Sequence, residues 1–221
     1  LWQVPGGYAM RELLGWKGTA AAYAQGKGGE AGGQPGTALA IMDPDGNELP
    51  PGEVGEVAIA GPHVMREYWN RPDATADVFR GRWFLSGDLG RMDADGDLWI
   101  VDRKKDLVIR GGYNVYPREV EEVLYGHPAV REAAVVGVPD ERLGEEIAAV
   151  VAPRDGAEID PVELRAWLAE RLAAYKVPRI YQVVPALPKG ATGKILKRQI
   201  AREELGASGV RTSRRTLTGT A

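Results

Sequence analysis

A short segment near the carboxyl end combines glycines with lysines, the composition of many phosphate-binding loops. It reads Lys189-Gly190-Ala191-Thr192-Gly193-Lys194. Glycines let backbone amides approach a phosphate, and a lysine adds positive charge. The spacing differs from a Walker A loop, which has four residues between its first glycine and the Gly-Lys pair and a Ser or Thr afterwards. Here two residues intervene and Ile195 follows. The segment alone therefore predicts a solvated lysine on a glycine turn.

Three other groups of residues favour a structural interpretation over a chemical one. The glycines of residues 26–33 neither follow a strand nor open a helix, so they indicate a linker and not a dinucleotide fingerprint. The acidic run Asp93 to Asp97 resembles a calcium loop, but its glycine comes too early and no glutamate closes it. His63 and His127 have no carboxylate at ligand spacing. We expect no metal ligands among these residues.

The composition excludes several classes of protein. The chain has 221 residues, 44% of them apolar, which is enough for one large domain or two small ones with a buried core. Its 28 basic and 31 acidic residues give a net charge of −3, so nothing indicates a nucleic-acid partner. The absence of cysteine fits a reducing compartment. No apolar run approaches the roughly 20 residues that span a bilayer, and no signal peptide is evident. We expect a cytoplasmic protein without a transmembrane segment.

Positive charge gathers toward the end of the chain. Residues 176–215 contain ten basic and two acidic side chains. A basic end on an acidic protein suggests a phosphate-bearing ligand. A solvated basic helix and tail explains the same pattern equally well.

The elements that must position these residues divide into two groups. Residues 37–104 read as a β-rich subdomain, and residues 105–206 as a small C-terminal α/β domain, so the predicted fold class is α/β (α+β). The first group has predicted strands at 38–43, 54–60, 83–85 and 98–101, turns at 44–47 and 93–96, and a helix at 73–79. The second has predicted helices at 117–125, from 161 and at 195–205, and strands at 133–138, 147–152 and 179–184.

The two ends of the chain have no sustained hydrophobic period. Residues 1–36 hold ten of the 29 glycines and read as a weakly structured or divergent N-terminal segment in which we find no family motif. Residues 207–221 are rich in Ser, Thr, Gly and Arg and predict a disordered tail. Inside the second group, Asp160 and Pro161 have the residue types of a helix cap and first turn.

Six motifs occur in one order along the chain. They are Gly55-Glu56-Val57-Ala58-Ile59-Ala60-Gly61-Pro62, Tyr68-Trp69-Asn70-Arg71-Pro72, Trp83-Phe84-Leu85-Ser86-Gly87-Asp88, Asp102-Arg103-Lys104-Lys105-Asp106, Arg110-Gly111-Gly112-Tyr113-Asn114-Val115-Tyr116-Pro117 and Pro188-Lys189 through Lys194. Over residues 37–206 this series resembles the C-terminal part of the acyl-adenylate-forming ligases, the superfamily of AMP-forming acyl-CoA synthetases, luciferases and peptide-synthetase adenylation domains. Its nearest likeness is to bacterial fatty-acyl or aryl-CoA synthetases.

The resemblance implies roles for individual residues. It places Asp88 on the ribose hydroxyls of ATP, which suits a carboxylate because it accepts hydroxyl hydrogen bonds. It places Arg103 on the nucleotide ribose or phosphates. Lys194 matches the family's catalytic lysine, which would bridge the substrate carboxylate and the α-phosphate.

The resemblance also implies a hinge and a thiol channel. Lys105 matches the hinge position, and Gly111 and Gly112 would let the backbone pass close to the pantetheine arm of coenzyme A. In such enzymes a carboxylate attacks ATP to form an acyl-adenylate, and the small domain then swings so that its opposite face admits the thiol. The implied ligands are ATP or AMP, coenzyme A and Mg²⁺, with a carboxylic acid as substrate.

Two family motifs are absent from these 221 residues. They are the Ser/Thr/Gly-rich phosphate loop and the Tyr-Gly-x-Thr-Glu segment, so the ligands of Mg²⁺ would lie mostly in a missing half. Two hypotheses follow. The chain is the C-terminal portion of an ATP-dependent acyl-CoA synthetase of fatty acid metabolism, or it is a catalytically silent fragment or module that binds coenzyme A, adenylate or a separate chain supplying the missing half.

Overall fold

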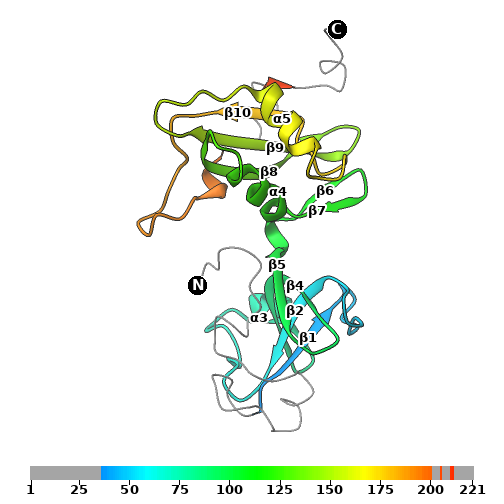
Figure 1. Cartoon of the computed structure of the whole chain (residues 1–221). Coiled ribbons are helices and arrows are strands. Elements are labelled where there is room, and N and C mark those ends of the chain that lie inside the picture. Colours follow the sequence, from blue (N-terminus) through cyan, green and yellow to red (C-terminus); the bar gives the residue numbers. More distant parts are fainter. Residues whose placement is uncertain (1–35, 201–204, 206–209, 212–221) are drawn as a thin grey trace. The chain divides into compact units, whose positions relative to one another are not determined.

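The chain forms two compact units, separated at the bond between Lys105 and Asp106. The computed structural model describes residues 36–200, 205 and 210–211 (Figure 1). We call the part up to Lys105 unit 1 and the part from Asp106 unit 2. Of the predicted N-terminal segment, residues 1–36, all but Gly36 lies outside the described residues.

Unit 1 is built on an antiparallel sheet. In the described residues its five strands are β1 (Ala38–Met42), β2 (Gly55–Ala60), β3 (Phe79–Arg80), β4 (Trp83–Met92) and β5 (Leu98–Arg103). β2 pairs with β1 and β4, while β3 and β5 both pair with β4. Alternate residues of the strands form an apolar cluster on each face. Ile41 and Val57 lie in one cluster, and Ala40 and Ala58 in the other.

The predicted hairpin at residues 38–60 is confirmed. β1 and β2 pair in antiparallel register from Ala38 opposite Ala60 to Met42 opposite Glu56. In the turn after β1, the Asp43 carboxylate accepts the backbone N–H of Asn47 at 2.8 Å. Polar turn chemistry between two apolar strands is the signal that made this hairpin predictable.

β4 is longer than its sequence pattern predicts. The prediction ended near Leu85, but the strand continues to Met92, with a register shift against β5 between Leu89 and Gly90. A Cβ at Gly90 would lie 2.8 Å from a methyl carbon of Val57. Glycine therefore permits close packing at this point, although in a sequence it reads as the end of a strand.

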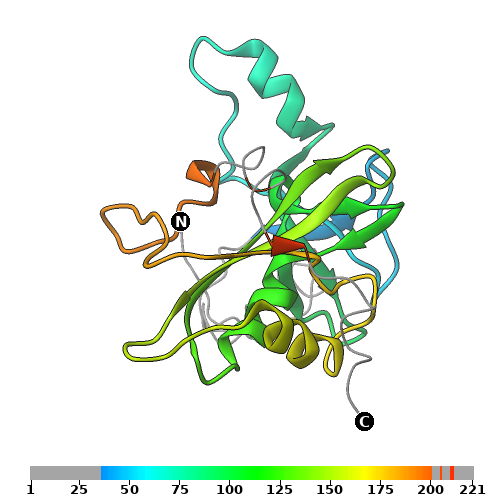
Figure 2. The same ribbon diagram turned by 90° about the horizontal axis from the view of Figure 1, so that it is seen from above.

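The predicted helix at 73–79 is present as α3 (Pro72–Val78), with proline in its first turn. None of its residues is buried. Figure 2 shows α3 (cyan) at the end of an excursion from the unit 1 sheet. The helix does not contribute to the unit 1 core.

Unit 2 combines a mixed sheet with two helices. Its described elements are strands β6 (Val108–Arg110), β7 (Tyr113–Val115), β8 (Val130–Asp140), β9 (Gly144–Pro153), β10 (Ile180–Val183) and β11 (Val210–Arg211), and helices α4 (Pro117–Tyr125) and α5 (Pro161–Ala169). β9 is central because it pairs antiparallel with β8 and β6 and parallel with β10 (Figure 1). The architecture confirms the predicted α/β (α+β) class, a β-rich subdomain followed by a small α/β domain.

Both faces of the unit 2 sheet are covered. Along β9, Ile147, Ala149 and Val151 belong to one apolar cluster, which includes Leu124 of α4 and Leu164 of α5. The alternate residues Ala148, Val150 and Ala152 belong to a second cluster, completed by Leu187 and Leu205, with Ile195 packed against it. We call these the helix face and the loop face. A strand buried on both faces has no alternation of apolar and polar residues. The continuous apolar runs of β8 and β9 follow this rule.

The predicted helix at 195–205 is wrong over residues 195–200. Of the other residues in that range, the structure describes only Leu205, which is helical. Ile195 forms an antiparallel bridge with Lys189, and the only helical turn that follows, before residue 201, is a 3-10 turn, η2 (Lys197–Gln199). Ile200 has an extended backbone, with φ −78° and ψ 118°. The periodic apolar residues of this segment pack on the loop face, although its backbone is irregular. A helical period in the sequence does not by itself distinguish such a segment from a helix.

Two residues of the predicted tail at 207–221 are placed by the structure. Val210 and Arg211 form β11, which pairs antiparallel with β10. The rest of that range lies outside the described residues. Among the residues described, no helix is long and apolar enough to cross a membrane.

The cap of α5 gives the first prediction. The Asp160 side chain accepts the backbone N–H of Val162 at 2.8 Å, as the sequence indicated. Replacing Asp160 by Ala should lower the free energy of unfolding of unit 2 by ~1 kcal/mol, whereas Asp160→Asn should retain it, because Asn caps as well as Asp. Hydrogen exchange of the α5 amides measures the effect. Equal exchange in both variants would contradict the capping role.

Candidate functional site

Asp88 and Arg103 lie side by side in unit 1. Asp88 on β4 is the direct register partner of Arg103, the last residue of β5. The Arg103 Nε lies 3.3 Å from the Asp88 Oδ1, and the two side chains are 31% and 34% exposed. The pairing holds both groups in place while leaving them accessible to a ligand. A carboxylate beside a guanidinium can accept hydroxyl groups and attract a phosphate.

Glu56 supports this pair, and sequence reasoning did not assign it a role. Its carboxylate accepts the backbone N–H of Gly87 at 3.0 Å and the Lys104 ammonium at 2.8 Å. Gly87 has a φ of +76°, a conformation that favours glycine. Glu56 therefore ties the residues next to Asp88 and Arg103 to β2. A charged residue within an apolar strand was the available signal, but its partners are 31 and 48 residues away.

Gly111 and Gly112 form the turn between β6 and β7 in unit 2. Arg110 pairs with Tyr113, which leaves a two-residue loop, and both glycines have positive φ, +56° and +83°. A type I′ hairpin turn requires this backbone at both central positions, which explains the Gly-Gly pair. A Cβ added to Gly112 would meet no atom within 4 Å. The backbone at Gly112 is thus open to an approaching ligand, whereas Gly111 packs against Leu143 and donates its N–H to the Leu143 carbonyl at 2.8 Å.

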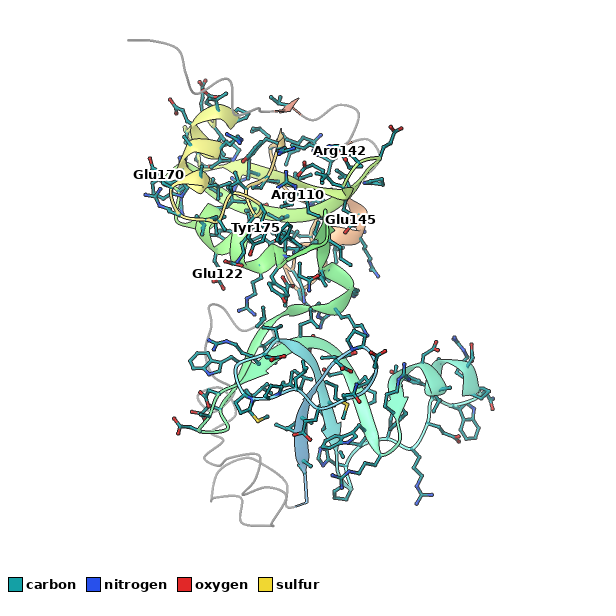
Figure 3. The ribbon with its side chains drawn as sticks, turned by 90° about the vertical axis from the view of Figure 1, so that its right-hand side faces the viewer. Arg110, Glu122, Arg142, Glu145, Glu170 and Tyr175 are labelled. Atoms are coloured by element: carbon teal, nitrogen blue, oxygen red, sulfur yellow. The ribbon has the colours of Figure 1, made fainter. Side chains whose placement is uncertain are left out.

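The residues that flank the glycine turn are fixed by long-range contacts (Figure 3). Buried Arg110 pairs with buried Glu146, with 3.0 Å between Nη2 and Oε2, and donates to the Tyr175 carbonyl at 2.8 Å. On the other side, the Tyr113 ring stacks on the Tyr175 ring with centroids 4.9 Å apart. Glu145 accepts the Ile109 N–H at 2.7 Å. These contacts hold the turn from both of its strands.

Lys176, next to Tyr175, anchors the same region to α4. Its Nζ lies 2.6 Å from the Glu119 Oε1. Burial disfavours the charged amine, but the hydrogen bond and the charge of Glu119 outweigh burial and raise the pKa of Lys176. Lys176 therefore remains charged and serves as a structural contact.

Lys194 lies on a small hairpin over the loop face. The Gly190 N–H donates to the Lys194 carbonyl at 2.8 Å and the Gly193 N–H to the Gly190 carbonyl at 2.9 Å, with Gly193 at a φ of +78°. This is the pattern of a three-residue loop closed by a glycine, and not of a phosphate-binding loop that opens a helix. Figures 1 and 2 show the surrounding segment (orange) projecting from the sheet. The glycines shape the loop that presents Lys194.

Some of the predicted site residues come together and others do not. Asp88 contacts Arg103 in unit 1. In unit 2, the apolar neighbours of the glycine turn belong to the helix face and those of Lys194 to the loop face. Lys105 is exposed and lies in a 3-10 turn, η1 (Lys104–Asp106), which includes the boundary between the units.

The described residues offer no candidate metal centre, since no group of three or more His, Asp or Glu side chains among them is arranged to hold an ion. His127 packs edge-on against Trp167, and burial lowers its pKa. Its contacts are those of a structural histidine.

Two family profiles match the chain. The profile described as "AMP-binding enzyme C-terminal domain" matches residues 119–194, and the one described as "AMP-binding enzyme" matches residues 2–69. The second match corrects our expectation that residues 1–36 have no counterpart in the family. The likeness extends almost to the first residue.

Curated relatives align with most of this chain. A feruloyl-CoA synthase from Amycolatopsis sp is 52% identical over 75% of this chain and 34% of the relative. A long-chain-fatty-acid–CoA ligase from Bacillus subtilis (strain 168) is 50% identical over 77% of this chain and 30% of the relative. The chain thus spans about a third of the length of the curated relatives it matches.

Solved structures agree with the sequence relatives. The chain matches ATP-bound MatB from Rhodopseudomonas palustris with a TM-score of 0.71 and 40% identity over 79% of this chain and 34% of that one. It matches o-succinylbenzoate CoA synthetase from Bacillus subtilis, in complex with its acyl-adenylate, with a TM-score of 0.69 and 40% identity over 77% and 35%. Profiles, relatives and structures together show that the chain belongs to the superfamily of AMP-forming, acyl-adenylate-forming ligases.

Proposed function

We propose that the chain is the C-terminal portion of an ATP-dependent acyl-CoA synthetase that acts on a fatty or aryl acid. The observation that supports this most strongly is the glycine hairpin that carries the half-buried Lys194, in a chain belonging to the AMP-forming ligases. The names of the relatives support the substrate class, because they include a feruloyl-CoA synthase and a long-chain-fatty-acid–CoA ligase.

The first step joins the acid to AMP. A carboxylate oxygen attacks the α-phosphorus of ATP, and the bond to pyrophosphate breaks, giving acyl-AMP and pyrophosphate. We assign Lys194 to the charge that builds up between the acid and the α-phosphate. Asp88 would accept the ribose hydroxyls, and Arg103 would contact the ribose or a phosphate. Their 3.3 Å pairing and their partial exposure support this assignment. We assign most of the ligands of Mg²⁺ to the half of the ligase that these 221 residues do not contain.

The second step transfers the acyl group to a thiol. The sulfur of coenzyme A attacks the acyl carbon, and AMP leaves with the electron pair of the broken C–O bond. We assign the open turn at Gly111 and Gly112 to the pantetheine arm. We assign Lys105 to the hinge about which unit 2 reorients between the steps. The apolar residues that support Lys194 and those that support the glycine turn lie on opposite faces of one sheet. This arrangement fits a domain that presents one face in the first step and the other face in the second.

A second candidate function is favoured by the length of the match. The chain spans about a third of its relatives, so it can instead be a silent module that binds coenzyme A, adenylate or a separate chain carrying the other residues. Calorimetry with coenzyme A and with AMP separates this module from an inert fragment.

Removing the Lys194 amine tests the first step. Release of pyrophosphate from ATP by the chain, with ferulate or a long-chain fatty acid as substrate, would exclude the silent module. Lys194→Ala should lower kcat about 100-fold or more, the scale seen when one preorganised charge-stabilising group is removed. Arg198→Ala removes an exposed positive charge from the same segment and should retain activity. Absence of turnover with every acid would favour the silent module, and equal turnover in Lys194→Ala would contradict the assigned role.

A substitution in the glycine turn tests the second step. Gly112→Ala adds a side chain at a φ of +83° to the open face of the turn. It should slow the formation of acyl-CoA while leaving pyrophosphate release in the absence of coenzyme A unchanged. Chromatography of acyl-CoA and the pyrophosphate assay measure the two steps separately. A matched loss in both would contradict a role confined to the thiol.

A further inference from the structure

The three lysines of the hairpin region differ in their partners. They lie within nine residues, at 189, 194 and 197. The Lys189 Nζ lies 2.7 Å from the Glu132 Oε1, and the Lys197 Nζ lies 2.7 Å from the Glu121 Oε1. Within residues 36–200, no carboxylate forms a salt bridge with Lys194. The outer two lysines each pair with a carboxylate of unit 2, whereas Lys194 forms no such pair with another residue of this range.

Glu132 anchors the chain before the hairpin. It lies on β8 with a side chain that is 10% exposed. While Oε1 binds Lys189, Oε2 accepts the backbone N–H of Leu187 at 3.0 Å. The hydrogen bond from Lys189 holds the pKa of the Glu132 carboxyl below its usual value. A carboxylate that remains ionised thus fixes two points of the segment that enters the hairpin.

Glu121 anchors the chain after the hairpin. It lies on α4 with a side chain that is 14% exposed, and its Oε1 also accepts the Val135 N–H of β8 at 2.7 Å. Lys197, its partner, belongs to η2. The second pair therefore ties the segment that leaves the hairpin to both a helix and a strand of unit 2.

The hairpin needs such anchors because it has few contacts of its own. Its internal hydrogen bonds join Gly190 to Lys194, Gly193 to Gly190, and Leu196 to Pro188. An isolated two-stranded hairpin is only marginally stable in water. A largely buried carboxylate is costly without a cationic partner, so each glutamate restrains its lysine. Glu132 also lies 3.3 Å from the Arg131 Nε, but Lys189 is nearer, at 2.7 Å. The restraints lie five residues before and three residues after Lys194.

We propose that Glu132 and Glu121 are positioning residues that hold the Lys194 hairpin at both ends through Lys189 and Lys197. The proposal rests on the proposed role of Lys194 for its functional meaning. Its physical content, a local restraint on the hairpin, is measured without substrate. A competing interpretation is that the two pairs only stabilise unit 2 as a whole.

Amide hydrogen exchange by NMR distinguishes these interpretations. The variants are Glu132→Gln and Glu121→Gln, and the matched controls are the exposed carboxylates Glu170→Gln and Glu122→Gln, which also pair with arginines. Exchange is read at Gly190, Gly193 and Leu196 in the hairpin and at residues 148–151 in β9. A second readout is the rate at which a limiting amine reagent acylates each lysine, measured by mass spectrometry.

Each glutamine variant should loosen the hairpin and leave the sheet unchanged. We expect about tenfold faster exchange at the hairpin amides, which corresponds to ~1.4 kcal/mol, and no change in β9. Lys189 should be acylated faster in Glu132→Gln only, and Lys197 in Glu121→Gln only. The proposal would be overturned by unchanged hairpin exchange, or by hairpin and β9 amides that accelerate by the same factor, since that pattern indicates global stability alone.

A double variant covers the case in which a single change destabilises the fold. Glu132→Gln with Lys189→Met removes both charges, so no unpaired charge remains buried. We expect the thermal stability of unit 2 to recover while hairpin exchange stays fast. Recovery of hairpin protection in the double variant would contradict positioning. Faster hairpin exchange with unchanged pyrophosphate release would count against the proposed role of Lys194 and not against the restraint.

Discussion

The β8–β9 pair is buried on both faces, and the arrangement of unit 2 depends on this constraint. Alternate residues of one strand belong to two separate apolar clusters. Helices α4 and α5 cover one face, so the other must be covered by the segment after β10. That segment has to cross the loop face, and Lys194 is placed there as a consequence. Burial thus determines where the lysine can be presented.

The same constraint separates the glycine turn from Lys194. The turn is held by Arg110 and by the Tyr113–Tyr175 stack, and Tyr175 packs against the helix-face cluster. The hairpin of Lys194 is supported by Leu187 and Ile195 on the loop face. The glycine turn and the Lys194 hairpin are therefore supported by different faces of one small sheet. A ligase that forms an adenylate and then a thioester can use them in turn.

Local patterns predicted much of this fold. The β1–β2 hairpin, the Asp160 cap and helix α4 all follow from turn residues, capping residues and period, which act over a few positions. The predictions failed where tertiary contacts determine the local structure. Residues 195–200 do not form the predicted helix, because Ile195 and Ile200 pack against the loop face and Lys197 is held by Glu121.

The site residues show the same division. Motif order identified Asp88, Arg103, the glycine turn and Lys194 as candidates. It did not identify the carboxylates that hold their surroundings, because Glu56 and Glu132 contact residues 31 to 57 positions away. Glu56 is a lone charge in an apolar strand, and Glu132 follows Arg131 just before an apolar run, which gave little sign of either role. Long-range pairing of this kind becomes visible only when the strands are placed.

The central claim is that the two faces of unit 2 serve different ligands. Titration of the ¹⁵N-labelled chain with coenzyme A, followed by amide chemical shifts, tests it most directly. The account predicts shifts at Gly111, Gly112 and Tyr113, with the amides of residues 189–197 unchanged. Shifts confined to the Lys194 hairpin, or no shift at the glycine turn at saturating coenzyme A, would contradict it.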